Sequence, residues 1–259
     1  MSKCIACWLD DAINLDRPRL QTSNSRFNVL ECRHCGLQWA DPMPTQDELD
    51  AYYRTYYQRK KDRSLAQVKN ALAKNVLEKV GWYKVRHLTF MHLINRHHPT
   101  KGVLLDYGCG EGQMLRVAKN DGWKVIGVDY SDEFAEALRA DGIEFHAASD
   151  LRSSGIAPDS IDCLVAKHVI EHIVVLEQFL SDCRTVLKPD GIMAIKMPSR
   201  TSLRARLGLA KWHFVNPPEH QWGFQPYCFR LLMESHGFEV LYLKDSLIVD
   251  ELTSIVGVR

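Results

Sequence analysis

The sequence predicts an α/β fold in which a doubly wound, mostly parallel seven-stranded sheet follows a small cysteine-rich segment and a helical linker. Three observations predict it. From residue 102 onward, short aliphatic strands alternate with amphipathic helices. A glycine-rich turn, DYGCGEG, follows the first of these strands, and two Cys-x-x-Cys pairs lie near the N-terminus. Strands that alternate with single helices need right-handed crossovers, which build a parallel sheet with helices on both faces.

The bulk composition is that of an ordinary globular protein. The chain has 259 residues, of which 46% are hydrophobic and 25% charged, and its formal net charge is +1. No global field therefore attracts nucleic acid or an anionic membrane. Apolar runs fall short of the ~18 residues of a membrane-spanning helix, and the N-terminal MSKCIACWLDD lacks the apolar stretch of a signal peptide. We expect a cytoplasmic protein with no membrane span and without nucleic acid as a partner.

The individual elements follow from hydrophobic periodicity and from turn signals. Strands are expected at residues 103–107, 124–129, 143–147, 161–166, 192–197, 239–245 and 254–259. Helices are expected at residues 113–120, 132–140, 174–187 and 229–238. Ser131 should cap the second of these helices, and residues 188–191 should form a turn. Upstream, Thr45 with Glu48 is a capping box, and apolar residues such as Leu65, Val68 and Leu72 predict two or three helices between 46 and 98.

The turn in VLLDYGCGEG, residues 103–112, predicts the class of cofactor. Glycines at alternate positions let the main chain approach a ligand closely, and open α/β sheets bind ligands at this edge. The dinucleotide fingerprint requires a glycine where Gln113 stands. Asp106, just before the turn, would repel a pyrophosphate but suits a cationic ammonium. These features favour S-adenosylmethionine, which carries an ammonium and a sulfonium and has no phosphate.

An acid at the end of the second strand supports this interpretation. Asp129 follows Asp106 by 23 residues, in IGVDYS. A carboxylate at this strand end can accept hydrogen bonds from both ribose hydroxyls, as the acid does in nucleotide-binding folds. The alternative is a buried turn with a capping aspartate. The order of strand, glycine turn, helix, strand and acid favours the cofactor site.

Residues 102–259 resemble the class I S-adenosylmethionine-dependent methyltransferases. The segments that carry the resemblance are VLLDYGCGEG, IGVDYS, SIDCLVAKHVIEHI, VLKPDGIMAIKMPS and GFEV. The resemblance implies a Rossmann-like seven-stranded sheet whose last strand runs antiparallel. It also implies a cofactor site with Asp106 at the amine, Gly108 and Gly110 beside the methionine part, Asp129 at the ribose, Ser149 or Asp150 at the adenine, and Tyr107, Tyr130 and Lys167 nearby. The segment AASDL lacks the family's usual glycine-acid pair.

The segment HVIEH, residues 168–172, matches a pattern of some zinc peptidases. A peptidase site needs a continuous helix to bring both imidazoles together, whereas this segment begins where a strand ends. Class I methyltransferases often carry His-x-x-Glu-His at the same point. Similarity to quinone-pathway methyltransferases implies a further alternative, in which Glu171 and His172 hold a divalent ion. Otherwise these two residues fix the loop.

Two histidines are candidates for a catalytic base. Transfer of a methyl group from a sulfonium to a hydroxyl needs removal of the hydroxyl proton, for which imidazole has a suitable pKa. His168 follows the fourth strand and should lie near the methyl group. His220, in NPPEHQWGF, is its rival, because a similar segment faces the acceptor in related enzymes. Either histidine could instead have a structural role.

The paired cysteines predict a structural zinc site. Cys4 and Cys7, with Cys32 and Cys35, supply four thiolates for a closed tetrahedral Zn²⁺ site. The 24 residues between the pairs exceed the usual zinc-ribbon gap of ~15–20. Free thiols or an iron-sulfur cluster are the weaker alternatives. The zinc ion should stabilise a segment too short to fold on its own core.

The segment CRHCGLQWADPMPTQDELDAYY, with the first cysteine pair, is similar to the front end of bacterial methyltransferases of sugar and polysaccharide pathways. Their C-methyltransferase relatives have a further C-terminal domain that this sequence does not show, so O- or N-methyl transfer is the expectation. The resemblance implies that a tyrosine-rich helix covers the cofactor pocket, unless its side chains serve only in packing. The tyrosines are Tyr52, Tyr53, Tyr56 and Tyr57.

The segment between the fifth and sixth strands should shape the acceptor site. It contains the basic residues Arg200, Arg204, Arg206 and Lys211 and the aromatic residues Trp212, Phe214 and Trp222. Such side chains suit an anionic acceptor, for example a phosphorylated or nucleotide-linked sugar. A solvated helix face is the alternative.

The predicted organisation has three parts: a zinc-ribbon-like segment (1–45), a helical lid or linker (46–100) and an S-adenosylmethionine-binding methyltransferase domain (101–259). The predicted function is methyl transfer to a small sugar-like or secondary-metabolite acceptor. One alternative is an RNA or protein methyltransferase that docks its substrate through the zinc segment. Another is a non-catalytic module that senses the cofactor.

Overall fold

The computed structural model describes residues 3–15, 26–49, 51–55, 75–201, 215–246 and 250–259, with the side chains of 75–85 excepted. The apolar repeat predicted at Leu65, Val68 and Leu72 lies outside these residues, as do Tyr56 and Tyr57. Among the described residues, no helix combines the length and apolar character needed to cross a membrane.

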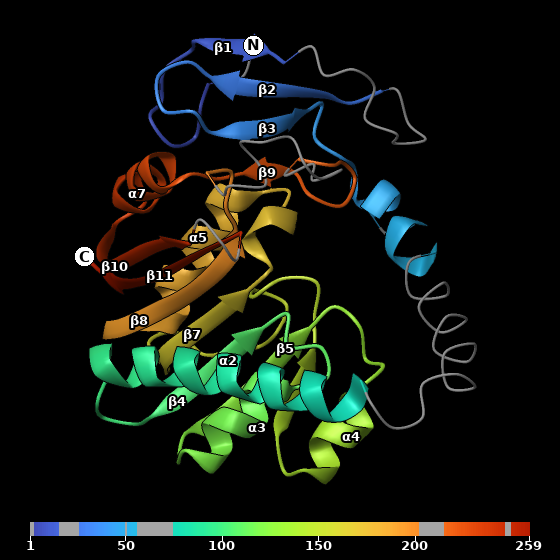
Figure 1. Ribbon diagram of the computed structural model, residues 1–259, viewed down its shortest axis with the longest axis vertical. Helices are drawn as coiled ribbons and strands as arrows, with labels where there is room; N and C mark the ends of the chain where they lie inside the picture. Colours follow the sequence, from blue (N-terminus) through green and yellow to red (C-terminus); the bar gives the residue numbers. More distant parts are fainter. Residues whose placement is uncertain (1–2, 16–25, 50, 56–74, 202–214, 247–249) are drawn as a thin grey trace.

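A seven-stranded sheet forms the body of the molecule and confirms the predicted fold class (Figure 1). Its strands are β4 (Val103–Tyr107), β5 (Lys124–Asp129), β6 (Glu144–Ala147), β7 (Ile161–Lys167), β8 (Leu187–Pro198), β10 (Phe238–Ser246) and β11 (Glu251–Val258). They lie in the order β10-β11-β8-β7-β4-β5-β6. The last strand, β11, is antiparallel to both neighbours, whereas β4 to β8 pair in parallel. The carboxyl ends of β4 to β8 therefore share one edge.

Helices cover both faces of the sheet. Helices α2 (Asn75–His97), α3 (Gln113–Asn120) and α4 (Ala135–Ala140) pack on one face, and α5 (Leu176–Val186) and α7 (Pro226–Ser235) on the other. Alternate residues of β7 serve the two faces, because successive side chains of a strand point to opposite sides. Leu164 belongs to the core beneath α5 and α7, and Val165 to the core beneath α2, α3 and α4.

Several element boundaries differ from the prediction; α7, predicted at 229–238, spans Pro226–Ser235, and β11, predicted at 254–259, begins at Glu251. Helix α4 begins at Ala135, because Ser131 closes a turn instead of capping the helix: its hydroxyl accepts the N–H of Glu133. The N–H of Ser131 is itself held by Asp129 at the end of β5, at 2.9 Å. The turn predicted at 188–191 is part of β8, which begins at Leu187 beside Ile161 and contains an irregularity in its pairing with β7.

The N-terminal segment forms a second, four-stranded sheet that we call the cysteine head (residues 3–15 and 26–41). Its strands are β1 (Ala12–Asn14), β2 (Asn28–Cys32) and β3 (Gln38–Asp41), and its fourth strand is β9 (Trp222–Gly223) from the far end of the chain. Trp39 of β3 lies opposite Trp222 of β9 in an antiparallel pair. The sequence did not predict this strand, because two residues carry no periodic signal.

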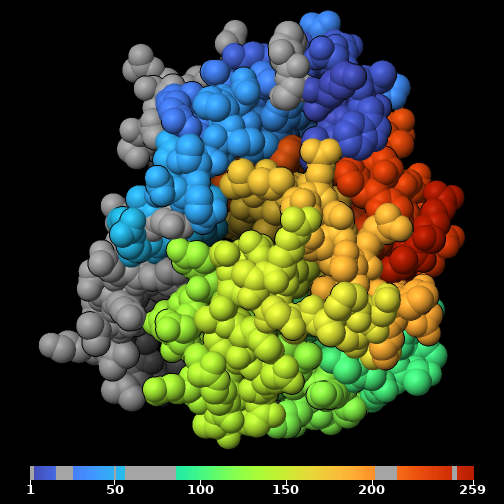
Figure 2. All heavy atoms as spheres, turned by 180° about the vertical axis from the view of Figure 1, so that it is seen from behind, coloured from blue at the N-terminus to red at the C-terminus, as the bar shows by residue number. Residues whose placement is uncertain are grey.

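The cysteine head shares the core of the main sheet. Buried Leu37 and Trp39 belong to the same apolar cluster as Phe229 of α7 and Leu180 of α5. In the space-filling view, the blue head lies directly on the yellow-to-red part of the chain (Figure 2). The head therefore shares its larger core with the main sheet, and a small separate cluster of Val29 and Ala40 packs with Val215.

Residues 46–49 and 51–55 form the helix predicted after the head. The capping box is confirmed. The N–H of Thr45 donates to Oε2 of Glu48 at 2.8 Å, and the N–H of Glu48 donates to the Thr45 hydroxyl at 3.3 Å.

Candidate active site

A cavity of about 1210 Å³ opens at the carboxyl ends of the parallel strands. This volume exceeds the ~300–1,000 Å³ of most ligand pockets, so a nucleoside cofactor and a second small molecule both fit. One end, the cofactor end, is lined by the predicted residues Tyr107, Gly108, Asp129, Tyr130, Ser149 and Asp150. The other end, the acceptor end, is lined by Tyr53, Arg86, His168, Glu171, His172, Glu219, His220, Asp250 and Glu251, with Gln46 and Leu49 beside them.

The glycine turn after β4 requires glycine for two different reasons. Gly108 has a φ of +74°, and a Cβ there would lie 2.6 Å from a methyl group of Val169. Gly110 has a φ of +49°, but a Cβ there would meet nothing within 4 Å. Gly108 is needed for packing, whereas Gly110 borders open space. Bare main chain beside open space can receive a ligand at close approach.

Asp129 joins the ends of β4 and β5. Its Oδ2 accepts the N–H of Gly110 at 2.8 Å, and its Oδ1 accepts the N–H of Ser131 at 2.9 Å. A carboxylate has about four lone-pair positions, so both oxygens keep acceptor capacity toward the cavity. The arrangement can bind a ribose diol while it holds the glycine turn in place.

Asp106 is buried behind the turn and does not line the cavity. Burial raises the pKa of this carboxyl to about 7, against the lowering effect of Lys167. A bound ammonium group nearby would favour the ionised form. Lys167, predicted among the cofactor residues, does not line the cavity either. Its ammonium lies 3.0 Å from Nε2 of His87 on α2, and burial lowers its pKa.

The far wall of the cofactor end is aromatic and polar. The Tyr107 ring lies 5.1 Å from the ring of Phe179, and its hydroxyl donates to the carbonyl of Ser149 at 3.3 Å. The carboxylate of Asp150 accepts the N–H of Ser153 at 2.7 Å, which lowers its pKa. Tyr130 is exposed at the rim. A flat base can stack and form hydrogen bonds here.

The segment HVIEH does not form the continuous helix of a zinc peptidase. β7 ends at Lys167, His168 has a φ of +55°, and only Ile170–His172 form a 3₁₀ turn. His168 lies between two carboxylates: its Nε2 is 3.2 Å from Oε1 of Glu251, and its Nδ1 is 3.6 Å from Oε1 of Glu171. Burial alone would lower the pKa of His168, but these carboxylates outweigh it and raise the pKa to about 9. His168 is therefore protonated at neutral pH, which argues against its predicted role as a base.

His220 has the opposite environment. Burial and the neighbouring His172 lower its pKa, and its buried Nδ1 has no hydrogen-bond partner. The rings of His172 and His220 meet edge to face at 4.6 Å, and Nδ1 of His172 lies 2.8 Å from the carbonyl oxygen of Glu219. A neutral imidazole with an unused nitrogen can accept a proton.

Glu171 stands beside these two rings as an unusual buried carboxylate. It is 2% exposed, and neither of its oxygens has a hydrogen-bond partner. Ligand atoms of Glu171, His172 and His220 all lie within 4.8 Å of one another. Burial would raise the pKa of this carboxyl, but His168, 3.6 Å away, and His172 lower it, while its oxygens still accept no hydrogen bond. This trio could hold a divalent metal ion.

The comparisons with known proteins agree with this geometry. The sequence pattern of a family described as a methyltransferase domain matches residues 57–243. The chain belongs to this methyltransferase family. A relative from Homo sapiens, the mitochondrial ubiquinone biosynthesis O-methyltransferase, is 30% identical over 166 residues, which are 57% of this chain and 45% of that protein. A Bradyrhizobium diazoefficiens ubiquinone biosynthesis O-methyltransferase is 33% identical over 101 residues, 38% of this chain and 40% of that protein. The chain thus covers about half of these relatives.

Two solved structures share the fold of this methyltransferase. One is the Burkholderia thailandensis 1,6-didemethyltoxoflavin-N1-methyltransferase, solved with 1,6-didemethyltoxoflavin and S-adenosylhomocysteine (TM-score 0.59, 14% identity, 91% of this chain and 97% of that chain). The other is a Pyrococcus horikoshii OT3 protein (TM-score 0.56, 20% identity, 68% of this chain and 91% of that chain). Seven strands with an antiparallel last strand are thus the class I methyltransferase fold that the sequence predicts.

The sequence analysis missed Arg86, Glu219, Asp250 and Glu251, which all line the cavity. Glu251, the first residue of β11, pairs with Arg86 of α2 at 2.8 Å and with Lys196 of β8 at 3.0 Å. Burial alone would raise the pKa of Glu251, but His168 and Lys196 outweigh it and lower the pKa to about 2. A signal was available, because an acid that begins an antiparallel last strand must lie at the carboxyl edge of its parallel neighbours. Arg86 lies in a helix without a distinctive motif.

The basic residues predicted to bind an anionic acceptor do not gather at the cavity, as far as the structure describes them. The Arg200 guanidinium pairs with Glu31 of the head at 2.7 Å, and it does not line the cavity. The indole N–H of Trp222 donates to the carbonyl of Ile173 at 2.6 Å. The other predicted residues, Arg204, Arg206, Lys211, Trp212 and Phe214, lie outside the described part of the chain.

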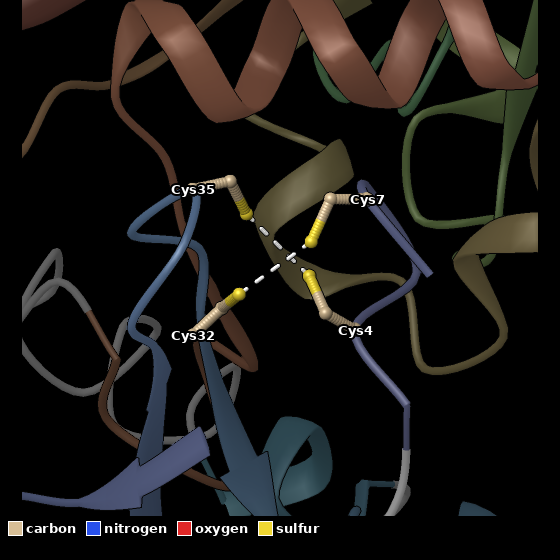
Figure 3. Close-up of side chains that lie close together, drawn as sticks. All are labelled: Cys4, Cys7, Cys32 and Cys35. Carbon is tan, nitrogen blue, oxygen red and sulfur yellow. Dashed lines mark hydrogen bonds between the residues drawn. The ribbon is translucent and has the colours of Figure 1, made fainter. Parts of the chain in front are cut away.

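The four paired cysteines of the methyltransferase lie together in the head (Figure 3). The sulfur atoms of Cys4 and Cys35 are 3.5 Å apart, as are those of Cys7 and Cys32. All four sulfurs lie within 4.8 Å of one another, and the cysteines are not disulfide-bonded. Four thiolates at ~2.3 Å around a tetrahedral Zn²⁺ are about 3.8 Å apart. The cluster fits a closed zinc site.

Proposed function

We propose that this protein transfers a methyl group from S-adenosylmethionine to a hydroxyl or amino group of a small molecule. One observation carries the proposal: a single cavity joins the glycine turn and Asp129 to the neutral imidazole of His220. The relatives that are ubiquinone biosynthesis O-methyltransferases favour a hydroxyl acceptor. When bound, the cofactor supplies an electrophilic methyl group on a sulfonium.

The chain's own residues divide the work of binding. Asp129 accepts the ribose hydroxyls, Asp106 stabilises the amine through its charge, and Tyr107, Ser149 and Asp150 surround the adenine. The open space beside Gly110 receives the methionine part. Holding the two reactants in one cavity supplies much of the rate by proximity and orientation.

His220 is the proposed base. Its imidazole, which lines the cavity, accepts the proton of the acceptor hydroxyl, and the neighbouring Glu171 carboxylate stabilises the imidazolium that forms. His168 and Glu251 hold the wall of the acceptor end through their ion pair. In this proposal His168 is a positioning residue, because a group with a pKa of about 9 has no lone pair to use at neutral pH.

A divalent ion on Glu171, His172 and His220 is the second candidate arrangement. The oxygens of Glu171, which accept no hydrogen bond, favour it. An ion there would lower the pKa of a bound hydroxyl, and it would occupy the lone pair of His220. The two arrangements therefore exclude each other. Calorimetric titration of the metal-free protein with Mn²⁺ distinguishes them, because only the ion site predicts binding that Glu171→Gln abolishes.

The acceptor that we propose is neutral and rich in hydroxyl groups. It is still sugar-like, as the sequence predicts, but it carries no phosphate. Four carboxylates line the described acceptor end, at Glu171, Glu219, Asp250 and Glu251, against the cations Arg86 and His168. This excess of acid disfavours a phosphorylated acceptor and also RNA. Acidic side chains are good acceptors for the hydroxyls of a polyol.

The three-part organisation and the structural zinc ion belong to the same proposal. Residues 1–45 hold the zinc ion on Cys4, Cys7, Cys32 and Cys35, residues 46–100 cover the site, and residues 101–259 bind the cofactor. Tyr53 supports a covering role, since it lines the cavity and its hydroxyl lies 3.2 Å from Nδ1 of His172. Within the described residues of the third part, β9 is the strand that joins the head sheet.

Incubation with methyl-labelled S-adenosylmethionine and a metabolite extract tests the proposed function. We expect the label to pass to one small molecule. The His220→Gln variant should slow this transfer by about 10²- to 10⁴-fold and leave the affinity for S-adenosylhomocysteine unchanged. Wild-type transfer should decline as pH falls below 6.5, because His220 must be deprotonated and its pKa is lowered. Unchanged transfer by His220→Gln would remove it as the base.

A further inference from the structure

The short strand β9 (Trp222–Gly223) connects the cysteine head to the acceptor end of the cavity. On one edge of this strand, Trp222 pairs with Trp39 of β3, and the N–H of Ala40 donates to the carbonyl of Gln221 at 2.9 Å. Toward the cavity, the N–H of Gln221 donates to the carbonyl of Glu171 at 2.8 Å. Gln221 directly follows His220, so the residue beside the proposed base bonds both to the head and to Glu171.

The hydrogen bonds that fix the His220 loop come from its main chain and from the side chains of the residues that follow it. The N–H of Asn216 donates to the carbonyl of His220 at 2.9 Å, and the indole of Trp222 donates to Ile173. By contrast, the Nδ1 atom of His220 has no hydrogen-bond partner. The place of this ring therefore depends on where its backbone is held, and the head supplies part of that support.

Two side chains from the sheet domain hold the second cysteine pair from outside. Arg200 donates to the carbonyl of Gly36 and pairs with Glu31 at 2.7 Å, and its guanidinium is largely buried. The amide of Gln225 donates to the carbonyl of Cys35 at 2.9 Å. Gly36 leaves room for that amide, because a Cβ on it would lie 2.1 Å from Nε2 of Gln225. These contacts surround the turn that carries Cys32 and Cys35.

Arg200 also links this turn to the end of β9. Its own N–H donates to the carbonyl of Phe224 at 3.0 Å, immediately after Gly223. A single residue thus contacts the cysteine turn through its side chain and the β9 segment through its backbone. A displacement of the cysteine turn can therefore be transmitted to the β9 segment through Arg200.

We propose that Arg200 and Gln225 are positioning residues that make the cysteine head a brace for the acceptor end, so that an ordered cysteine site fixes where His220 and Glu171 stand. The proposal rests on the zinc site and the base proposed above. The cofactor end does not depend on this brace, because the bonds of Asp129 to Gly110 and Ser131 lie within the main sheet. Loss of the brace should therefore loosen one end of the cavity and spare the other.

Hydrogen-deuterium exchange tests the brace without any knowledge of the acceptor. The variants are Arg200→Gln and the milder Glu31→Gln, each compared with the wild type before and after zinc removal by a strong chelator. We expect amide exchange in peptides covering 216–223 and 170–173 to accelerate about tenfold in all three altered samples. Exchange in 104–115 and 125–130, and the affinity for S-adenosylhomocysteine measured by calorimetry, should stay within about twofold of the wild type.

The matched control is Arg230→Gln, which removes an exposed ion pair with Glu234 on α7 at 3.6 Å and should change none of these rates. Unchanged protection of 216–223 in Glu31→Gln, or in the chelated wild type after elemental analysis confirms zinc loss, would overturn the brace. Acceleration in every peptide together with weaker cofactor-product binding would also overturn it, since that shows global loosening. Absence of zinc in the purified protein would instead count against the zinc proposal, and the Arg200→Gln and Glu31→Gln variants would still test the brace.

Discussion

Asp106 sits in a buried space between two charges, Lys167 and Asp129, and its carboxyl has a pKa of about 7. This value lies far above the ~3.9 of a free aspartate because burial removes solvation from the ionised form. The protonated carboxyl stabilises the fold fully below about pH 4, and this contribution is lost as pH rises through 7. A cationic ligand reverses the balance, because it favours the ionised form.

Asp106→Asn should therefore have two opposite effects. At pH 8 it should raise the free energy of unfolding of the cofactor-free protein by an amount on the order of 2 kcal/mol, and with it the melting temperature, because the unfavourable buried charge is gone. The same variant should bind S-adenosylhomocysteine at least about tenfold more weakly. Thermal denaturation at pH 5 and pH 8, with calorimetric titration, measures both. A lower melting temperature at pH 8 would contradict the assigned charge state.

His168 gives a prediction of the opposite pH sense. Its folded pKa of about 9 exceeds the ~6.5 of a free histidine, so its contribution to stability is complete below pH 6.5 and is lost as pH rises through 9. The side chain is 43% exposed, and solvent screening reduces the contribution to about 1 kcal/mol. His168→Gln should therefore be less stable than the wild type at pH 6. The difference should shrink by pH 10 in denaturant titrations, and a constant difference would count against the ion pair.

At the scale of elements, the cysteine head depends on its metal as well as on its packing. Cys32→Ser should contain no zinc, because three thiolates and a hydroxyl lose most of the affinity of a four-thiolate site. Elemental analysis of freshly purified protein should find about one zinc per wild-type chain. Cys183→Ala is the matched control, since Cys183 is buried in α5 away from the cluster and should keep the zinc. A zinc-free wild type would contradict the site.

The sequence predicted those elements whose signals lie within a few consecutive residues. The glycine turn, the strands on either side of it and the capping box of Thr45 and Glu48 follow from signals a few residues long. β9 could not be predicted, because its two residues are strand only through pairing with a segment far away in the sequence. The continuation of β8 through KPDG has the same cause, since Leu187 pairs with Ile161.

The candidate site also contains residues that local sequence signals predict and residues whose role depends on the assembled fold. Asp129 and Gly108 lie at strand ends that the sequence marks, and the structure brings both to the cavity. The choice between His168 and His220 could not be made from the sequence, because it depends on Glu251, which is 83 residues from His168 along the chain. Charge states in buried clusters are properties of the assembled fold.

At the scale of the whole molecule, one cavity serves two regions held in different ways. The cofactor end is fixed by bonds between β4 and β5, and the acceptor end by contacts among η1 (Ile170–His172), β9, β11 and the head. Such a division allows the acceptor end to vary while the cofactor end keeps its geometry.

Binding of S-adenosylhomocysteine, compared between the wild type and Asp129→Ala, tests the central claim most directly. Titration calorimetry should show binding of S-adenosylhomocysteine by the wild type and no binding of NAD⁺. The Asp129→Ala variant should lose at least about 2 kcal/mol of binding free energy, because the ribose acceptor and the tie to Gly110 disappear together. No heat with S-adenosylhomocysteine, or binding of NAD⁺ in its place, would contradict the account.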